Sequence, residues 1–111
     1  MTKQKASLGE LEQLILLAVL RLDEGAYAVS IGDELRSQAS IETPRGAIYV
    51  TLDRLERKGM LRSRFGDPTP ERGGKAKRYF QVTQTALPLL RSSQAALLNL
   101  WDGVDLGKEK A

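Results

Sequence analysis

The 111-residue sequence contains neither cysteine nor histidine. The absence of cysteine excludes disulfide bonds, thiolate metal sites and thiol catalysis. The absence of histidine removes the commonest general base and metal ligand, which leaves only carboxylates, lysine, tyrosine and hydroxyl groups for chemistry. We therefore predict that the protein is not an enzyme and that it uses no metal ion or other cofactor.

Long apolar runs are also missing. The longest run, LILLAVL at 14–20, has seven residues, which is too short to cross a bilayer. The first residues, MTKQKAS, carry lysines but no apolar segment of a signal peptide behind them. We expect a cytoplasmic protein without a membrane partner. The hydrophobic content of 41% suits one small domain with an adequate core.

The net charge of +3 is unevenly distributed along the chain. Between Arg45 and Arg78 there are ten lysines and arginines against four acidic residues, whereas the rest of the chain has seven against ten. A local basic segment in a folded domain favours a polyanion such as nucleic acid as partner, although a solvated surface is the commoner explanation of any one charged run.

The segment 44–61, PRGAIYVTLDRLERKGML, predicts a helix with two different faces. Thr43 suits the N-cap position and Pro44 the first helical position, while Gly59 after Lys58 favours a helix end. At about 100° per residue, one narrow apolar stripe is expected to face the core: Ile48, Leu52 and Leu55. The opposite face then carries Gly46, Val50, Asp53, Arg54 and Arg57, flanked by Arg45, Ala47 and Tyr49.

The residues before this helix predict two more helices. Ser7 and Glu10 match a capping box, so a first helix is expected from there to about Asp23, with Glu12 on its surface. This helix is apolar on more than one side, which predicts contact with a second copy of the chain. A second helix is expected at about 30–38, with Ser30 or a neighbour as cap, and Ile41 in the connection is a candidate for a very short strand. Two helices joined in this way form a helix-turn-helix.

After Gly59 the sequence pattern predicts a β-hairpin. Residues 60–65 and 77–83 favour two strands, and the glycine- and proline-rich segment 66–74 favours the tip between them. A helix-turn-helix followed by a hairpin is a winged helix, so the predicted fold class is mainly α with a small β-hairpin wing. Three cations in or beside the tip are expected to reach the phosphate backbone or the minor groove: Arg72, Lys75 and Lys77.

The last helix is expected at about 84–103 with Thr83 as its cap. Its apolar residues recur at heptad spacing, which predicts a dimer interface; the seam comprises Leu87, Leu90, Gln94, Leu97, Trp101 and Val104. We divide the chain into a winged helix-turn-helix domain at 1–83, a dimerisation helix at 84–104 and a flexible tail at 105–111.

These residues resemble the PadR-like family of transcriptional regulators, in the short form with a single C-terminal dimerisation helix. The resemblance rests on LGELEQLILLAVL at 8–20, Ala26-Tyr27, GAIYVTLDRLERKGML at 46–61 and GGKAKRYFQVT at 73–83. It implies a homodimer that binds an inverted-repeat operator in double-stranded DNA and represses transcription. Together with the outward helix face, it predicts a DNA-binding set: Arg45, Gly46, Tyr49, Val50, Arg54, Arg72, Lys75 and Lys77.

Other roles follow less directly. The predicted dimer contacts are Leu11, Ile15, Leu87, Leu90, Leu97 and Trp101. Trp101 is also a candidate stacking surface for a small apolar effector at the dimer interface, although plain dimer core is the commoner role of such a tryptophan. Asp53 would be repelled by phosphates unless it accepts a hydrogen bond from cytosine or orients an arginine. An alternative function is a winged-helix interaction module that docks an acidic partner and binds DNA only nonspecifically.

Overall fold

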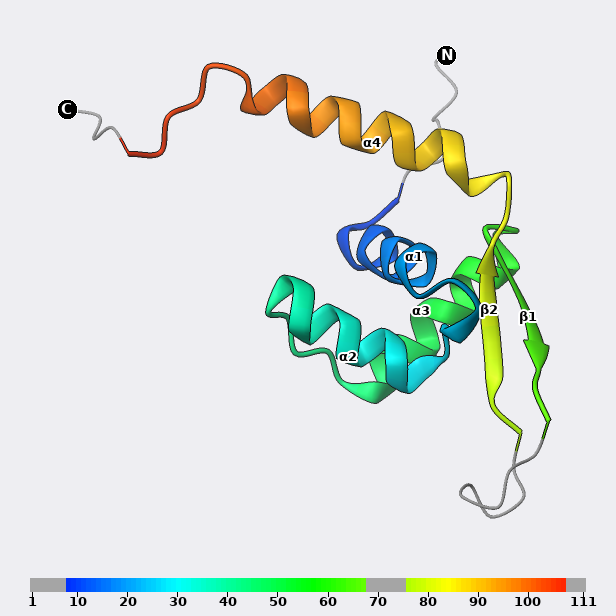
Figure 1. Cartoon of the computed structure of the whole chain (residues 1–111). Coiled ribbons are helices and arrows are strands. Elements are labelled where there is room, and N and C mark those ends of the chain that lie inside the picture. Colours follow the sequence, from blue (N-terminus) through cyan, green and yellow to red (C-terminus); the bar gives the residue numbers. More distant parts are fainter. Residues whose placement is uncertain (1–7, 68–75, 108–111) are drawn as a thin grey trace.

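The computed structural model describes residues 8–67 and 76–107. In chain order the elements are α1 (Glu10–Leu22), a 3-10 turn η1 (Asp23–Gly25), α2 (Ala28–Ala39), α3 (Arg45–Arg57), β1 (Leu61–Phe65), β2 (Arg78–Val82) and α4 (Ala86–Trp101). Figure 1 shows α1, α2 and α3 packed together, the β1–β2 hairpin at one side and α4 extending away from the bundle. The winged helix-turn-helix with a following helix is confirmed. In the described parts of the chain, no helix combines the length and apolar character needed to span a membrane.

Helix α1 begins at Glu10, later than the sequence suggests. Ser7 of the expected capping box lies outside the described residues. The side chain that reaches back to the helix start belongs to Glu12, whose Oε1 accepts a hydrogen bond from the Gly9 N–H at 2.9 Å. Glu10 is exposed at the helix start. The expectation that Glu12 lies on the helix surface is wrong, because Glu12 is only 5% exposed.

Helix α2 starts two residues earlier than expected. Ser30 is not its cap but lies in its first turn, where its hydroxyl accepts a hydrogen bond from the Tyr27 N–H at 2.9 Å. The turn into α3 contains no strand at Ile41. A Cβ atom on Gly32 would lie 3.2 Å from the side chain of Ile48, so the missing side chain lets α2 approach α3 closely.

Helix α3 begins one residue later than predicted and ends where predicted. Pro44, not Thr43, is the N-cap residue, and the buried Thr43 hydroxyl has no hydrogen-bond partner among the described residues. At the other end Gly59 adopts φ +78°, and the Met60 N–H donates to the Leu55 carbonyl at 2.9 Å. This Schellman arrangement needs a left-handed residue, which glycine adopts without a steric cost.

The two strands pair antiparallel, with Ser63 opposite Phe80. The Phe80 N–H donates to the Ala26 carbonyl at 2.9 Å, which attaches β2 to the segment before α2. Phe65 at the end of β1 is 69% exposed, so burial in this strand ends before its last residue. Thr83 does not cap α4, because its hydroxyl donates to the Gly59 carbonyl at 2.6 Å; the N-cap residue of α4 is Thr85.

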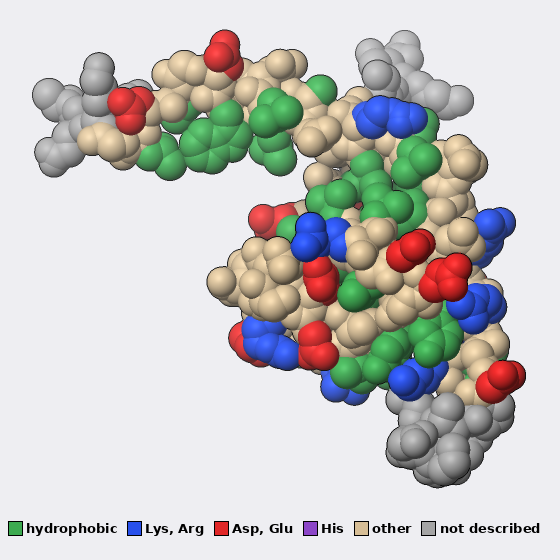
Figure 2. All heavy atoms as spheres, in the orientation of Figure 1, with side chains coloured by type: hydrophobic (Ala, Val, Ile, Leu, Met, Phe, Trp, Pro, Cys, Tyr) green, Lys and Arg blue, Asp and Glu red, His purple; other side chains and the backbone are tan. Residues whose placement is uncertain are grey.

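The core lies between α1, α2, α3 and the hairpin. Its most fully buried large side chains are those of Ile15, Leu16, Val19, Ile31, Ile48, Leu52, Leu55 and Leu61. Helix α4 adds the buried Ala86, with Leu89 and Leu90 packed partly against this core. The remainder of α4 extends beyond the body, and Figure 2 shows apolar side chains gathered along its overhanging side. Val104 follows the end of α4, so the helical part of the predicted seam ends at Trp101.

Candidate nucleic-acid interface

Helix α3 presents the two faces that its sequence predicts. Ile48, Leu52 and Leu55 are each at most 1% exposed, and Thr51 is buried beside them. Seven residues of the opposite side are exposed: Arg45, Gly46, Tyr49, Val50, Asp53, Arg54 and Arg57. A surface helix that exposes apolar Tyr49 and Val50 beside arginines offers both hydrogen-bond donors and apolar groups to a partner.

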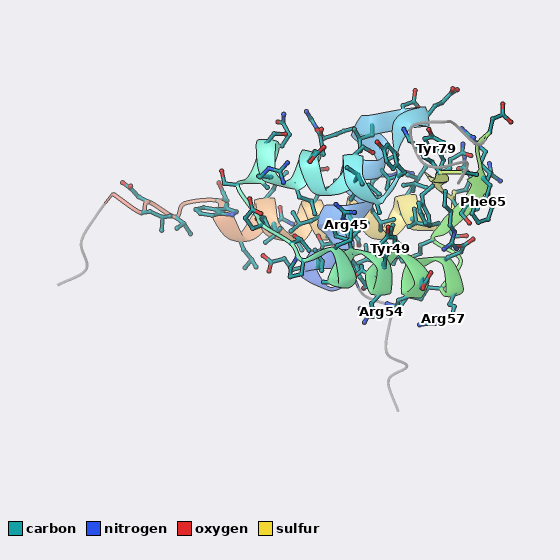
Figure 3. The ribbon with its side chains drawn as sticks, turned by 90° about the horizontal axis from the view of Figure 1, so that it is seen from below. Arg45, Tyr49, Arg54, Arg57, Phe65 and Tyr79 are labelled. Carbon is teal, nitrogen blue, oxygen red and sulfur yellow. The ribbon has the colours of Figure 1, made fainter. Side chains whose placement is uncertain are left out.

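Arg45 and Tyr49 lie along one edge of this face. Figure 3 shows both on the side of α3 toward α2, whereas Arg54 and Arg57 lie along the opposite edge. A groove of about 230 Å³ runs from this edge to the start of α2 and to β2. Its lining includes Tyr27, Arg45, Tyr49, Arg78 and Phe80. The first turns of α3 therefore adjoin both the start of α2 and the wing.

Arg54 is oriented toward α1. Its Nη1 lies 4.0 Å from Oε2 of Glu12, and the same carboxylate oxygen accepts a hydrogen bond from Lys58 Nζ at 2.8 Å. Burial alone would raise the pKa of Glu12, but the hydrogen bonds from Lys58 and the Gly9 N–H, with the charges of Lys58 and Arg54, lower the pKa below its usual 4.5. The Arg54 side chain therefore contributes to the contact between α3 and α1, and part of it stays exposed on the outer surface of α3.

The described part of the wing combines cations with aromatic rings. The Lys77 ammonium lies 4.5 Å from the centre of the Tyr27 ring, and the Arg64 guanidinium lies 4.9 Å from that of Tyr79. The two tyrosine rings meet edge to face with centroids 5.7 Å apart. These contacts hold the positive charges beside the start of α2. Arg72 and Lys75, also predicted to bind DNA, lie outside the described residues.

Arg78 is a site residue that the sequence analysis missed. Its Nη1 lies 3.3 Å from Asp53 Oδ1, its Nη2 pairs with Glu56, and its Nε donates to the Ser63 hydroxyl at 3.1 Å. Asp53 and Glu56 lie beside Arg54 and Arg57 in the sequence. In the structure both carboxylates pair with Arg78 of the wing. No local spacing signals this, because the partners are 25 and 22 residues apart.

The family model described as the transcriptional regulator PadR-like family matches residues 16–86. The chain belongs to this family. The winged helix is accordingly that of a DNA-binding transcriptional regulator, and the expected resemblance to the PadR-like family is confirmed.

Three other proteins are similar to this chain. An uncharacterized protein of Lysinibacillus sphaericus is 31% identical over 75 residues, which cover 68% of this chain and 66% of that protein. A PadR family regulator from Eggerthella lenta is 29% identical with a TM-score of 0.65, over 85% of this chain and 81% of that one. A PadR family regulator from Clostridium difficile, 18% identical, has a TM-score of 0.68 over 85% of this chain and 96% of that one, and it supports the fold alone.

Not all of the residues predicted for a PadR-like dimer interface are available to a second chain. Leu97 and Trp101 are 55% and 52% exposed on α4. Leu11 and Leu90 are partly buried against the chain's own core, and Leu87 is half-buried. Ile15 has no exposed surface in a single chain, so it packs inside its own domain and presents nothing to a partner. On α1 the exposed apolar residues are instead Leu17 and Leu20, each 46% exposed.

Proposed function

We propose that this PadR-like regulator is a repressor that binds an inverted-repeat operator as a homodimer. The observation that carries the proposal is the exposed side of α3, where Arg45 and Tyr49 adjoin the wing along one groove. An α-helix fits the major groove of DNA, and the first turns of a recognition helix reach the base edges. We assign base contacts to the stretch 45–50 and phosphate contacts to the wing.

The DNA contacts divide by chemistry. Arg45 offers the planar donor pair that suits guanine, and Val50, 55% exposed, offers an apolar contact for a thymine methyl group. Gly46 has no neighbouring atom within 4 Å of a Cβ position, so the backbone can come close to DNA there. Lys77, with Arg72 and Lys75 from the wing sequence, supplies salt-dependent affinity. Arg54 belongs to the proposed DNA contacts only along the edge of α3 that lies opposite Arg45 and Tyr49.

The surface of α4 supports dimerisation. Six large apolar side chains are at least half exposed on α4 and just after it: Leu97, Leu98, Leu100, Trp101, Val104 and Leu106. A small domain seldom leaves so many grouped apolar side chains in water. A second copy that packs against them, with α1 as a neighbour, gives a two-fold dimer. Its two recognition helices would then meet half-sites about one helical turn, roughly 34 Å, apart.

Trp101 offers a place for regulation at the same interface. Its ring is half exposed in the single chain, and a planar apolar effector stacked on it would become buried between two copies. Trp101 is the sole tryptophan of the chain, so its fluorescence reports on that position alone. Saturable quenching of this fluorescence by a planar hydrophobic dye, together with loss of dye binding in Trp101→Leu as read from the dye's own fluorescence polarisation, supports the effector site; equal dye polarisation with both proteins contradicts it.

Selection of duplexes from a random library by the purified protein tests the operator proposal. The expected result is enrichment of an inverted repeat whose half-site centres are about one turn apart. Cloned upstream of a reporter gene, that sequence should lower transcription when the protein is present. If no sequence is enriched and all duplexes bind weakly and with steep salt dependence, the interaction module with an acidic partner becomes the better explanation.

A further inference from the structure

The side chains of Asp53, Glu56, Ser63 and Arg78, here called the wing clamp, join three elements. Asp53 and Glu56 belong to α3, Ser63 to β1 and Arg78 to β2. The Arg78 guanidinium uses all three of its nitrogens, donating to Ser63 through Nε, to Asp53 through Nη1 and to Glu56 through Nη2. The Ser63 hydroxyl donates to the second oxygen of Glu56 at 2.8 Å. The recognition helix and both strands of the wing therefore meet at one arginine.

The geometry of the clamp requires arginine. The guanidinium carbon lies 5.0 Å from the centre of the Phe80 ring. A planar fork can stack on a ring and satisfy three separate acceptors at fixed angles, whereas the ammonium of lysine is a point charge on a flexible chain. Arg78 is 37% exposed and its two carboxylate partners are 53% and 32% exposed. Solvent at these exposures weakens each ion pair, so the clamp adds little to the stability of the fold.

The position of the clamp suggests what it does instead. The hairpin leaves α3 through the turn at Gly59 and Met60, which connects the wing directly to the end of the helix. Asp53 and Glu56 lie within the last two turns of α3, before this turn, and Arg78 and Ser63 lie on the hairpin beyond it. A contact on both sides of a turn restricts the angle between the elements that the turn connects.

We propose that Arg78 and Glu56 are positioning residues that fix the wing at the angle at which wing and recognition helix contact one DNA site together. The inference rests on the proposed function and adds a specificity device to it. The clamp also commits Arg78 to the protein, so this cation is not a free phosphate contact. The clamp carboxylates of Asp53 and Glu56 lie on the DNA-binding side. Their negative charge near phosphates lowers affinity for every duplex.

Glu56→Gln distinguishes a positioning role from a purely electrostatic one, because the two roles predict opposite changes in affinity for the selected duplex. Removal of a negative charge alone should raise affinity for all duplexes. Loss of positioning should lower affinity for the duplex enriched by selection by about tenfold, as is typical for breaking a coupled network, while a scrambled duplex binds as well as before or better. Arg78→Lys, which keeps the charge but loses the fork, should give the same loss of preference.

Glu34→Gln is the matched control, since it breaks the carboxylate pair with Arg21 at 2.6 Å, between α1 and α2. It should leave the ratio of the two affinities unchanged. Thermal unfolding of all variants checks that they are folded. Equal rises on both duplexes for Glu56→Gln would overturn the proposal.

A measurement without DNA keeps the clamp testable on its own. Residual dipolar couplings of backbone amides report the orientation of the hairpin relative to α3 in the free protein. Wild type and Glu34→Gln should fit one common orientation for both elements, whereas Glu56→Gln should need a separate or averaged orientation for the hairpin. A common fit for all three proteins contradicts the clamp. A wild type that prefers no duplex contradicts the operator proposal and leaves this measurement to decide the clamp.

Discussion

At the scale of single residues, Glu12 shows how this small domain accommodates a buried charge. A carboxylate that is 5% exposed is costly unless it is paired and hydrogen-bonded. Lys58 pairs with this carboxylate, the Gly9 N–H donates a hydrogen bond to it, and Arg54 adds a second positive charge. Because Lys58 and Arg54 belong to the end of the recognition helix, this one carboxylate ties α1 to α3. Sequence periodicity did not reveal this, since α1 is apolar on so many sides that its inward face is ambiguous.

The lowered pKa of Glu12 gives a prediction about pH. A carboxyl whose pKa is lower in the folded chain stabilises the fold fully above its ordinary value of 4.5, and this stabilisation is lost as pH falls through the folded value. Glu12→Gln should therefore unfold about 1 kcal/mol more easily than wild type at pH 7, a figure reduced for the partial exposure of Lys58.

Denaturant unfolding at pH 7, 4.5 and 3, at one protein concentration, measures this difference. It should shrink as pH falls through the lowered pKa of Glu12, because protonation then removes the charge of this carboxylate in the folded chain as well. A difference that stays constant with pH would assign the effect of the substitution to packing instead of charge.

At the scale of elements, the C-terminal end of α3, which local chemistry sets, was predicted well. Gly59 ends α3 as expected because only the backbone around it matters, and the buried stripe of α3 follows from its period. The starts of α1, α2 and α4 were each misplaced. In α1 and α2 the side chain that bonds the helix start reaches back from inside the helix, from Glu12 and Ser30. Thr83, expected to cap α4, bonds to the Gly59 carbonyl across the fold.

Gly59→Ala tests the end of α3. A side chain at φ +78° is strained, so the substitution should lower the free energy of unfolding by about 1 kcal/mol. Gly46→Ala is the comparison, because it lies in helical backbone with open space around it and should raise stability by up to about 0.5 kcal/mol. Denaturant unfolding of the two variants should thus shift in opposite directions, and a neutral Gly59→Ala would contradict the strained geometry.

At the scale of the whole molecule, the winged helix was predictable but its contacts between distant residues were not. Order and type of the helices and strands follow from local patterns. The pairing of Arg78 with Asp53 and Glu56, and the burial of Ile15, depend on how the elements pack in three dimensions. The same limit applies to dimerisation: sequence indicated an apolar seam, and the structure shows which of its members remain exposed.

Leu97→Glu tests the dimer. A charge in the middle of the exposed face of α4 should be costly to bury against a second chain, so the variant should sediment as a 12.3 kDa monomer where the wild type sediments at twice that mass. Ser92→Glu places the same charge on the exposed opposite side of α4 and should remain a dimer. A dimeric Leu97→Glu would mean that α4 is not the interface.

The central claim, that the first turns of α3 read DNA sequence, is tested most directly by titrating Arg45→Ala against the selected duplex and a scrambled one. Loss of a base contact predicts a fall in affinity for the selected duplex of about tenfold or more, with a much smaller effect on the scrambled one. Arg36→Ala, which removes an exposed arginine that pairs with Asp33 on α2, should bind as wild type does. Equal affinities for wild type and Arg45→Ala on the selected duplex would contradict the claim.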